Sequence, residues 1–167
     1  GKQIKPKAWE NLSGTKLEEE VYRYTYDVLK GLKMCGLMPD MVQIGNELTN
    51  GFLWPDGKLP NYSSMMNLLK KGISAARDIS SDIKIIIHLD NGGNNAMYRD
   101  WLDRASCEGV DYDIIGLSYY PYWHGTLDDL EYNMNDISQR YGKDVVVVET
   151  AYAFTTETYR NEKMIFT

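Results

Sequence analysis

The chain has 167 residues, of which 43% are hydrophobic and 25% are charged. These proportions are ordinary for a folded globular chain, so disordered and fibrous classes are excluded. The net charge of −6 and the lack of a Lys/Arg-rich helical face argue against a nucleic-acid partner. The longest apolar run, around residues 83–89, is far shorter than the roughly 18 residues that a membrane span needs.

The first predicted element is a helix near the start of the chain. The spacing of Thr15 and Glu18 fits a capping box, and Gly36 can end the helix. Between them, apolar residues recur on one helical face: Leu17, Val21, Tyr24, Val28 and Leu32.

Strands and helices alternate through the rest of the chain. Strands are predicted at residues 41–45, 83–89, 114–119 and 145–148. A helix starting at Asn61 or Ser63 follows the first strand, and a weaker one over residues 96–104 follows the second. Thr126 and Asp129 start a helix after the third strand, and Gly142 ends it.

The apolar runs "IKIIIHL" and "VVVV" do not alternate with polar residues, which is typical of parallel strands buried on both faces. A helix, three strand-helix units and a last strand fit an α/β fold, either doubly wound or part of a (β/α)8 barrel. A complete barrel takes roughly 250 residues. We therefore expect residues 1–167 to be an incomplete single catalytic domain of a larger enzyme.

Polar side chains follow every predicted strand, at the end where parallel α/β folds place their chemistry. Glu47 and Glu149 each follow an apolar strand, three units apart. One such Glu is most often a solvated or ion-paired surface residue. Two in equivalent places predict the paired carboxylates of a retaining glycoside hydrolase, in which one protonates the leaving oxygen and the other attacks the sugar. A hydroxyl from Tyr119 or Tyr120 can keep the attacking carboxylate ionised.

The runs "PDMVQIGNELTNGFLWPDG", "IIIHLDNGGN", "DIIGLSYYPYWHG" and "VVVVETAY" resemble those of glycoside hydrolase family 53, the arabinogalactan endo-β-1,4-galactanases. The resemblance extends from "GKQIKPKAW" through Tyr152. It implies a (β/α)8 barrel. This chain would contain the portion of that barrel from after strand 3 through strand 7. It also implies that Glu47, after strand 4, is the acid/base, and that Glu149, after strand 7, is the nucleophile.

The same resemblance implies a β-1,4-galactan polysaccharide as partner and an extracellular or periplasmic location. No secretion signal is visible, because the basic residues 1–7 precede no apolar segment. The alternative is a carbohydrate-binding or inactive remnant, since four of eight strands leave the sheet open. We accordingly expect the 167-residue chain by itself to show little activity.

The candidate substrate-binding residues are polar or aromatic and lie in the segments that follow the strands. For His88 the alternative is a hydrogen-bonded core imidazole. Trp54 and Trp123 are expected to stack on galactose, whereas Trp9 and Trp101 are expected to pack in the core. The full set is Asn46, Trp54, His88, Asp90, Asn91, Ser118, Tyr119, Tyr120 and Trp123.

No metal or cofactor is expected. A zinc site needs three suitably spaced ligands, and His88 and His124 are the only histidines. "NGGNN" lacks the spacing of a nucleotide-binding loop. Some relatives bind calcium after strand 7, but Glu157 alone does not make a hard-cation site. The two cysteines, Cys35 and Cys107, fit no metal or redox motif, and we expect both to be buried thiols.

Overall fold

The computed structural model describes residues 3–153, so Glu157 lies outside the described part. Four strands form one parallel sheet in the order β1-β4-β5-β6, and β2 pairs with β3 in a small antiparallel hairpin. The strands are β1 (Met41–Gln43), β2 (Gly51–Phe52), β3 (Gly57–Lys58), β4 (Lys84–Leu89), β5 (Ile114–Tyr119) and β6 (Asp144–Thr150). The helices are α1 (Gly14–Met34), α2 (Tyr62–Ile79), α3 (Asn95–Cys107) and α4 (Leu127–Tyr141), with 3-10 turns at Lys7–Trp9 and Leu48–Asn50.

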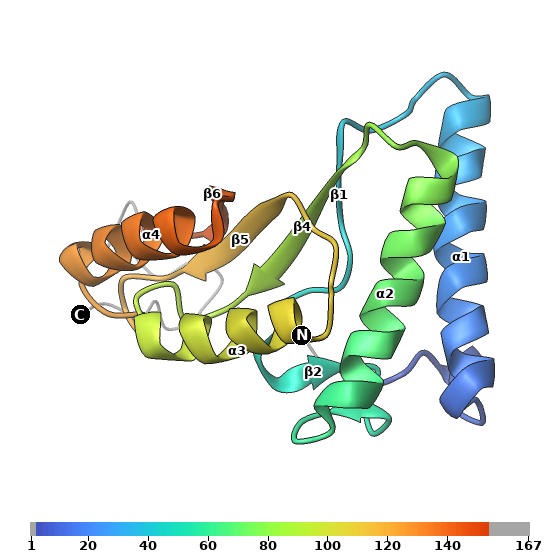
Figure 1. Ribbon diagram of the computed structural model, residues 1–167, viewed down its shortest axis with the longest axis horizontal. Helices are drawn as coiled ribbons and strands as arrows, with labels where there is room; N and C mark the ends of the chain where they lie inside the picture. The colour runs from blue at the N-terminus through green and yellow to red at the C-terminus, as the bar shows by residue number, and fades with distance from the viewer. Residues whose placement is uncertain (1–2, 154–167) are drawn as a thin grey trace.

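The alternation of helices and parallel strands is the predicted one. The sheet curls, and the helices lie outside it, with α1 and α2 side by side next to β1 and β4 (Figure 1). Each connection between parallel strands passes through a helix, so all four strands end at the same rim. The described residues therefore form a curled half-barrel.

Alternate residues of β4 and β5 are completely buried and belong to the hydrophobic core with the apolar faces of the helices. Tyr98 and Trp101 of α3 are also buried, which confirms the packing role predicted for Trp101. Their polar atoms are satisfied: the Tyr98 hydroxyl donates to the Leu89 carbonyl at 2.9 Å, and Trp101 Nε1 donates to the Leu48 carbonyl at 3.2 Å. These two bonds tie α3 to the last residue of β4 and to the turn that follows β1.

Two of the predicted helix starts are confirmed and one is wrong. Asn61 caps α2 by accepting from the Ser64 amide, and Thr126 with Asp129 forms a capping box on α4. The capping box expected at Thr15 is wrong, because α1 begins at Gly14, with Ser13 as its N-cap. Thr15 therefore already lies inside the first turn.

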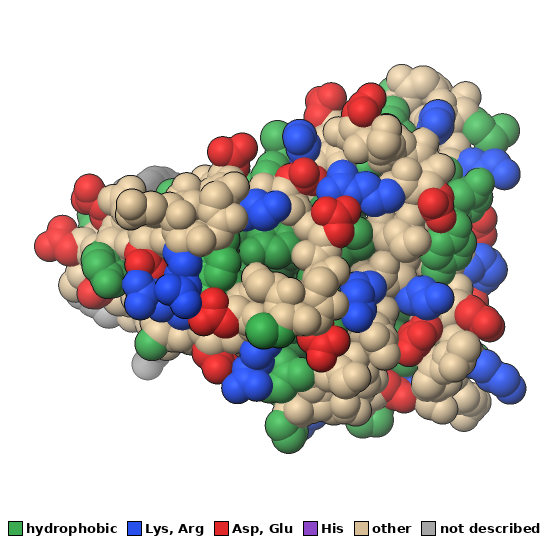
Figure 2. Space-filling model, in the orientation of Figure 1, with side chains coloured by type: hydrophobic (Ala, Val, Ile, Leu, Met, Phe, Trp, Pro, Cys, Tyr) green, Lys and Arg blue, Asp and Glu red, His purple; other side chains and the backbone are tan. Residues whose placement is uncertain are grey.

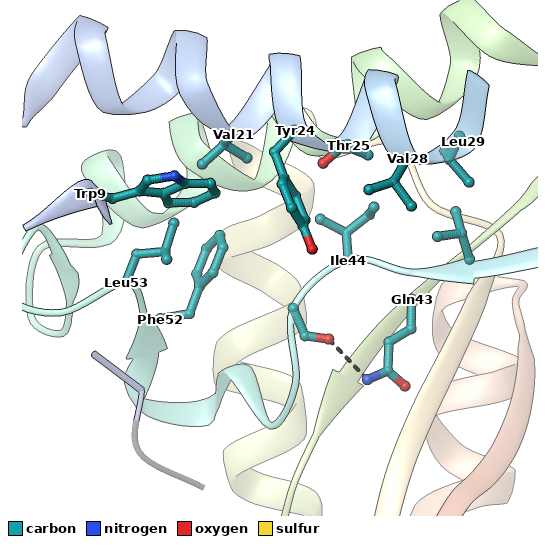
Figure 3. Close-up of a pocket in the computed structure, with 12 residues that line it drawn as sticks. Trp9, Val21, Tyr24, Thr25, Val28, Leu29, Gln43, Ile44, Phe52 and Leu53 are labelled. Atoms are coloured by element: carbon teal, nitrogen blue, oxygen red, sulfur yellow. Dashed lines mark hydrogen bonds between the residues drawn. The ribbon is translucent and has the colours of Figure 1, made fainter. Parts of the chain in front are cut away.

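Several apolar residues are less buried than their pattern predicts. Tyr24 and Val28 of α1 are 57% and 45% exposed, beside an apolar hollow of about 310 Å³ between α1 and β1 (Figure 3). Val146 of β6 is 40% exposed, so the prediction that the "VVVV" strand is buried on both faces is wrong. The physical reason is that, among the described residues, β1 and β6 are edge strands and each pairs on one side only.

The two cysteines are also a correction, since both are exposed free thiols. Cys35 is the C-cap of α1, and Cys107 is the last residue of α3. Because both cysteines lie at helix C-termini that are exposed to solvent, neither thiol is buried.

The surface carries charges of both signs. On the face shown in Figure 2, acidic and basic side chains are interspersed, without an extended patch of one sign. Within residues 3–153, no helix combines the length and the apolarity needed to cross a bilayer.

Candidate active site

Glu47 lies in a tight turn directly after β1. Its φ of 47° is in the left-handed region, which side chains other than glycine rarely adopt and which often marks functional sites. Gly45, two residues earlier, has a φ of 79°, and a Cβ there would approach Leu48 Cδ2 to 2.5 Å. The turn thus requires glycine at position 45 and directs Glu47 to the rim of the sheet.

Two glutamines that were not predicted as site residues, Gln43 and Gln3, hold this turn. Gln43 Nε2 donates to the Gly45 carbonyl at 2.9 Å and to Asn46 Oδ1 at 3.2 Å. Gln3 Nε2 donates to the Asn46 carbonyl at 2.7 Å. The only sequence signal was the amide side chain that interrupts the apolar strand in "MVQIG".

Glu149 reaches the same rim through an irregularity in the pairing of β5 with β6. Leu117 pairs with Val147, but Ser118 pairs with Glu149, so Val148 is an extra residue on β6. Because side chains alternate between the two faces of a strand, a shift by one residue moves every later side chain to the other face. The shift therefore places Glu149 on the same face as Ser118.

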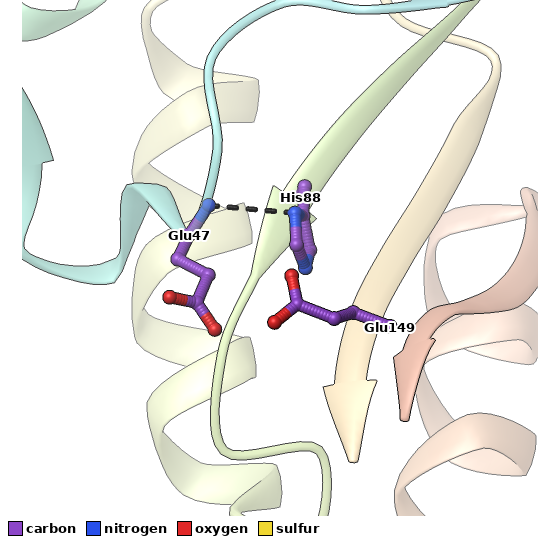
Figure 4. A group of neighbouring side chains, drawn as sticks. All are labelled: Glu47, His88 and Glu149. Atoms are coloured by element: carbon purple, nitrogen blue, oxygen red, sulfur yellow. Dashed lines mark hydrogen bonds between the residues drawn. The ribbon is translucent and has the colours of Figure 1, made fainter. Parts of the chain in front are cut away.

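The structure brings Glu47, His88 and Glu149 together, as Figure 4 shows. One carboxylate oxygen from each Glu and a ring nitrogen of His88 all lie within 4.8 Å of one another. They come from three different strand ends, after β1, on β4 and on β6. The paired carboxylates expected at the carboxyl ends of the strands are therefore present.

His88 is buried, with 1% of its surface exposed, and both of its ring nitrogens have partners. Nε2 lies 2.8 Å from Ser118 Oγ. Nδ1 accepts from the backbone amide of Glu47 at 3.4 Å and lies 3.1 Å from Asn46 Oδ1. Burial lowers the pKa of His88, so the ring is neutral at neutral pH.

The cluster of two carboxylates and one imidazole has the donor types of a metal site. A metal would need a free lone pair on a His88 nitrogen, and both nitrogens are already engaged, Nε2 with Ser118 Oγ and Nδ1 with the backbone amide of Glu47. The cluster therefore fits two carboxylates that are each held by a hydroxyl, Glu47 by Ser118 and Glu149 by Tyr120, better than it fits a metal centre.

Tyr120 supports Glu149. Its hydroxyl donates to Glu149 Oε1 at 2.6 Å, and this bond to a carboxylate raises the pKa of Tyr120 to about 12. The phenol therefore stays protonated and donating at any ordinary pH. The His124 ring contacts the Tyr120 ring edge-on with centroids 5.5 Å apart, and its Nδ1 accepts from the Tyr120 amide at 3.2 Å.

The adjacent Tyr119 points the other way. It is 4% exposed, and its hydroxyl donates to the Gly125 carbonyl at 3.0 Å. Ser118 has no exposed surface at all. Neither side chain, nor His88, presents a surface to a ligand, which differs from the expectation of direct sugar contact at these three positions.

The remaining predicted residues are half-buried or exposed. Trp123 is 59% exposed and lies beside Tyr120, with ring centroids 5.9 Å apart. Trp54 is half-buried, with Lys58 Nζ 4.4 Å from the centroid of its ring. Asp90 Oδ1 is a buried acceptor without a hydrogen-bond partner among the described residues. Asn91 has a φ of 53° and lines a polar hollow with Trp123.

Comparisons with known proteins identify the family. Residues 1–166 match the profile of Glycosyl hydrolase family 53. A solved chain described as the Ignisphaera aggregans GH53 catalytic domain superposes with a TM-score of 0.92 at 49% identity, over 96% of this chain and 44% of that one. A chain from a study of two fungal β-1,4-galactanases gives a TM-score of 0.83 at 32% identity, over 89% of this chain and 47% of that one.

A curated relative gives the same result. The endo-β-1,4-galactanase of Bacillus subtilis (strain 168) is 37% identical over 156 residues, which are 93% of this chain and 35% of that protein. The chain thus spans less than half the length of each of these three proteins. Its half-barrel corresponds to part of a (β/α)8 barrel, as predicted. The match over residues 1–166 and these likenesses show that the chain belongs to glycoside hydrolase family 53.

Proposed function

We propose that the protein to which these residues belong is an endo-acting, retaining glycoside hydrolase that cleaves β-1,4-galactan. The observation that carries this proposal is that one carboxylate oxygen of Glu47 lies within 4.8 Å of one of Glu149, in a chain of this family. Retaining enzymes hold their carboxyl groups about 5 to 5.5 Å apart, whereas inverting enzymes leave about 6.5 to 9.5 Å for a water molecule. Carboxylate oxygens this close to each other fit the shorter, retaining separation.

In the first step, Glu47 donates its proton to the glycosidic oxygen while Glu149 attacks the anomeric carbon. The bond to the leaving sugar breaks, and a covalent galactosyl ester forms on Glu149. In the second step, Glu47 takes a proton from water, and the resulting nucleophile displaces Glu149. Two inversions give a product with the anomeric configuration of the substrate.

The surroundings of the carboxylates support this division of labour. Glu149 accepts a 2.6 Å hydrogen bond from a phenol that stays protonated, which stabilises the ionised form that a nucleophile needs. Glu47 follows β1, the strand that corresponds to strand 4 in the family resemblance. We assign Glu47 as acid/base and Glu149 as nucleophile.

The accessible polar and aromatic residues around the pair are proposed to hold the polymer. Trp123 offers an exposed ring on which a galactose face can stack. Asn46 and Asn91 offer amides, and the half-buried side chain of Asp90 is proposed to accept from a sugar hydroxyl. Trp54 is proposed as a second stacking ring. Because the polymer lies outside cells, we also propose an extracellular or periplasmic location.

The stereochemistry of the first product tests the proposal. Proton NMR of galactan hydrolysis by the complete protein is expected to show the β-anomer first, with the α-anomer appearing only as mutarotation proceeds. An initial α-anomer would mean a single displacement and would contradict the role of Glu149 as nucleophile.

A second test concerns Tyr120. Tyr120→Phe removes the donor to Glu149 and is expected to lower kcat on galactan about 10- to 100-fold, since a hydrogen bond to a charged group contributes about 1.5 to 3 kcal/mol. Tyr119→Phe is the matched control, because its hydroxyl bonds a carbonyl away from the carboxylates. Equal losses in the two variants, measured as kcat, would contradict the support of Glu149 by Tyr120.

A further inference from the structure

Ser118 lies between the proposed acid/base and the buried imidazole. Its Oγ is 2.8 Å from Glu47 Oε1 and 2.8 Å from His88 Nε2. With no exposed surface, Ser118 cannot replace either contact by a bond to bulk water. A hydroxyl donates only one hydrogen bond, so it must donate to one of these partners and accept from the other.

The carboxylate decides the direction of both bonds. An ionised carboxylate only accepts, so Ser118 donates to Glu47 Oε1 and must then accept from His88 Nε2. His88 is neutral and has one ring proton, which this assigns to Nε2. Nδ1 is then free to accept the backbone amide of Glu47 at 3.4 Å. The imidazole thus bonds Glu47 twice, once through Ser118 and once through its backbone.

We propose that Ser118 is a positioning residue that keeps Oε1 of Glu47 an acceptor throughout the reaction, so that the proton passed to the glycosidic oxygen is carried by Oε2. This inference rests on the proposed acid/base role of Glu47. When Glu47 is ionised, Ser118 donates to a charged Oε1. When Glu47 is protonated on Oε2, Ser118 donates to the carbonyl-like Oε1, and neither Ser118 nor His88 has to move.

Without this bond, the carboxyl group can rotate and can carry its proton on either oxygen. Only a fraction of the enzyme molecules then carry the Glu47 proton on the oxygen that faces the glycosidic bond. This lowers the rate of proton transfer without weakening substrate binding. Because Ser118 has no surface that a polymer can touch, its loss is expected to change kcat and to leave KM nearly unchanged.

The test is Ser118→Ala in the complete protein, which removes one oxygen atom and preserves the packing of Cβ. We expect kcat on galactan to fall about tenfold, with KM within twofold of its original value. Ser138→Ala is the matched control, because it likewise removes a single serine hydroxyl. The Ser138 hydroxyl donates to a backbone carbonyl at 2.8 Å, at the far end of α4. Ser138→Ala is expected to leave kcat unchanged.

A double-mutant cycle separates positioning of Glu47 from a general structural effect. In the Glu47→Gln background, Ser118→Ala is expected to change the residual kcat on galactan by less than twofold, because no acid is left to position. The same tenfold loss in both backgrounds, or a loss confined to KM, overturns the proposal. If Glu47→Gln itself leaves galactan hydrolysis intact, it is the proposed function that fails, whatever Ser118→Ala does.

Discussion

Glu149→Gln is expected to abolish hydrolysis of galactan and of activated aryl galacto-oligosaccharides alike. Without the carboxylate no galactosyl ester can form, and a good leaving group does not compensate for a missing nucleophile. Removing a covalent nucleophile can cost on the order of 10⁶-fold in kcat. The measurement is kcat on both substrates, with Glu131→Gln, at an exposed position on α4, as the control that retains activity.

Azide makes this test sharper. In Glu149→Gly, the space left by the side chain admits azide, which can displace an activated leaving group from the side where the carboxylate stood. A single displacement of this kind inverts the anomeric centre, so the expected product is an α-galactosyl azide. Recovery of a β-galactosyl azide from this variant would show that attack comes from the opposite face and that Glu149 is not the nucleophile.

The order of the elements was predictable because continuous apolar runs and helical periodicity reflect burial directly. The run around Ile85 to Leu89 is buried because β4 lies between two other strands. The same reasoning failed for Val146, since an apolar run does not reveal whether its strand lies at an edge of the sheet. Tyr24 and Val28 failed likewise, because periodicity gives the direction of an apolar face and not what covers it.

The candidate site was predictable only as a set of residues near the strand ends. Sequence placed Glu47 and Glu149 at equivalent positions, but the approach of their side chains depends on a left-handed turn at Glu47 and on an extra residue in β6. Gly45 indicates a turn but not the direction of the Glu47 side chain, and the extra residue in β6 has no local sequence signal. The adjacent residues Tyr119 and Tyr120 were equally hard to tell apart from the sequence. Successive side chains of a strand point to opposite faces, so Tyr119 is buried and Tyr120 points at Glu149.

Buried polar contacts were the least predictable part. The sequence favours a role for His88 in holding sugar hydroxyls or tuning Glu149 over a core imidazole, and only the structure shows both of its nitrogens held. Ser118 reads as one more polar residue at a strand end. Its lack of exposed surface and its two 2.8 Å contacts turn it from a candidate ligand of sugar into a contact between His88 and Glu47.

Glu47→Gln is expected to have an effect that depends on the substrate. Galactan has a poor leaving group that needs a proton, so kcat should fall about 10²- to 10⁴-fold. An aryl galacto-oligosaccharide with an acidic phenol leaves without protonation, so the first step should remain close to its original rate. A burst of phenol followed by slow turnover is then expected, because no base activates water for the second step.

The covalent intermediate that accumulates in Glu47→Gln gives the most direct reading of both roles. Mass spectrometry of the trapped protein should show one galacto-oligosaccharide attached at Glu149. Azide needs no general base, so it should restore turnover and yield a β-galactosyl azide through two displacements, the opposite anomer to that expected from Glu149→Gly. If Glu47→Gln instead loses the phenol burst as completely as Glu149→Gln does, the two carboxylates do not divide the work between acid/base and nucleophile, even though they lie within 4.8 Å of each other.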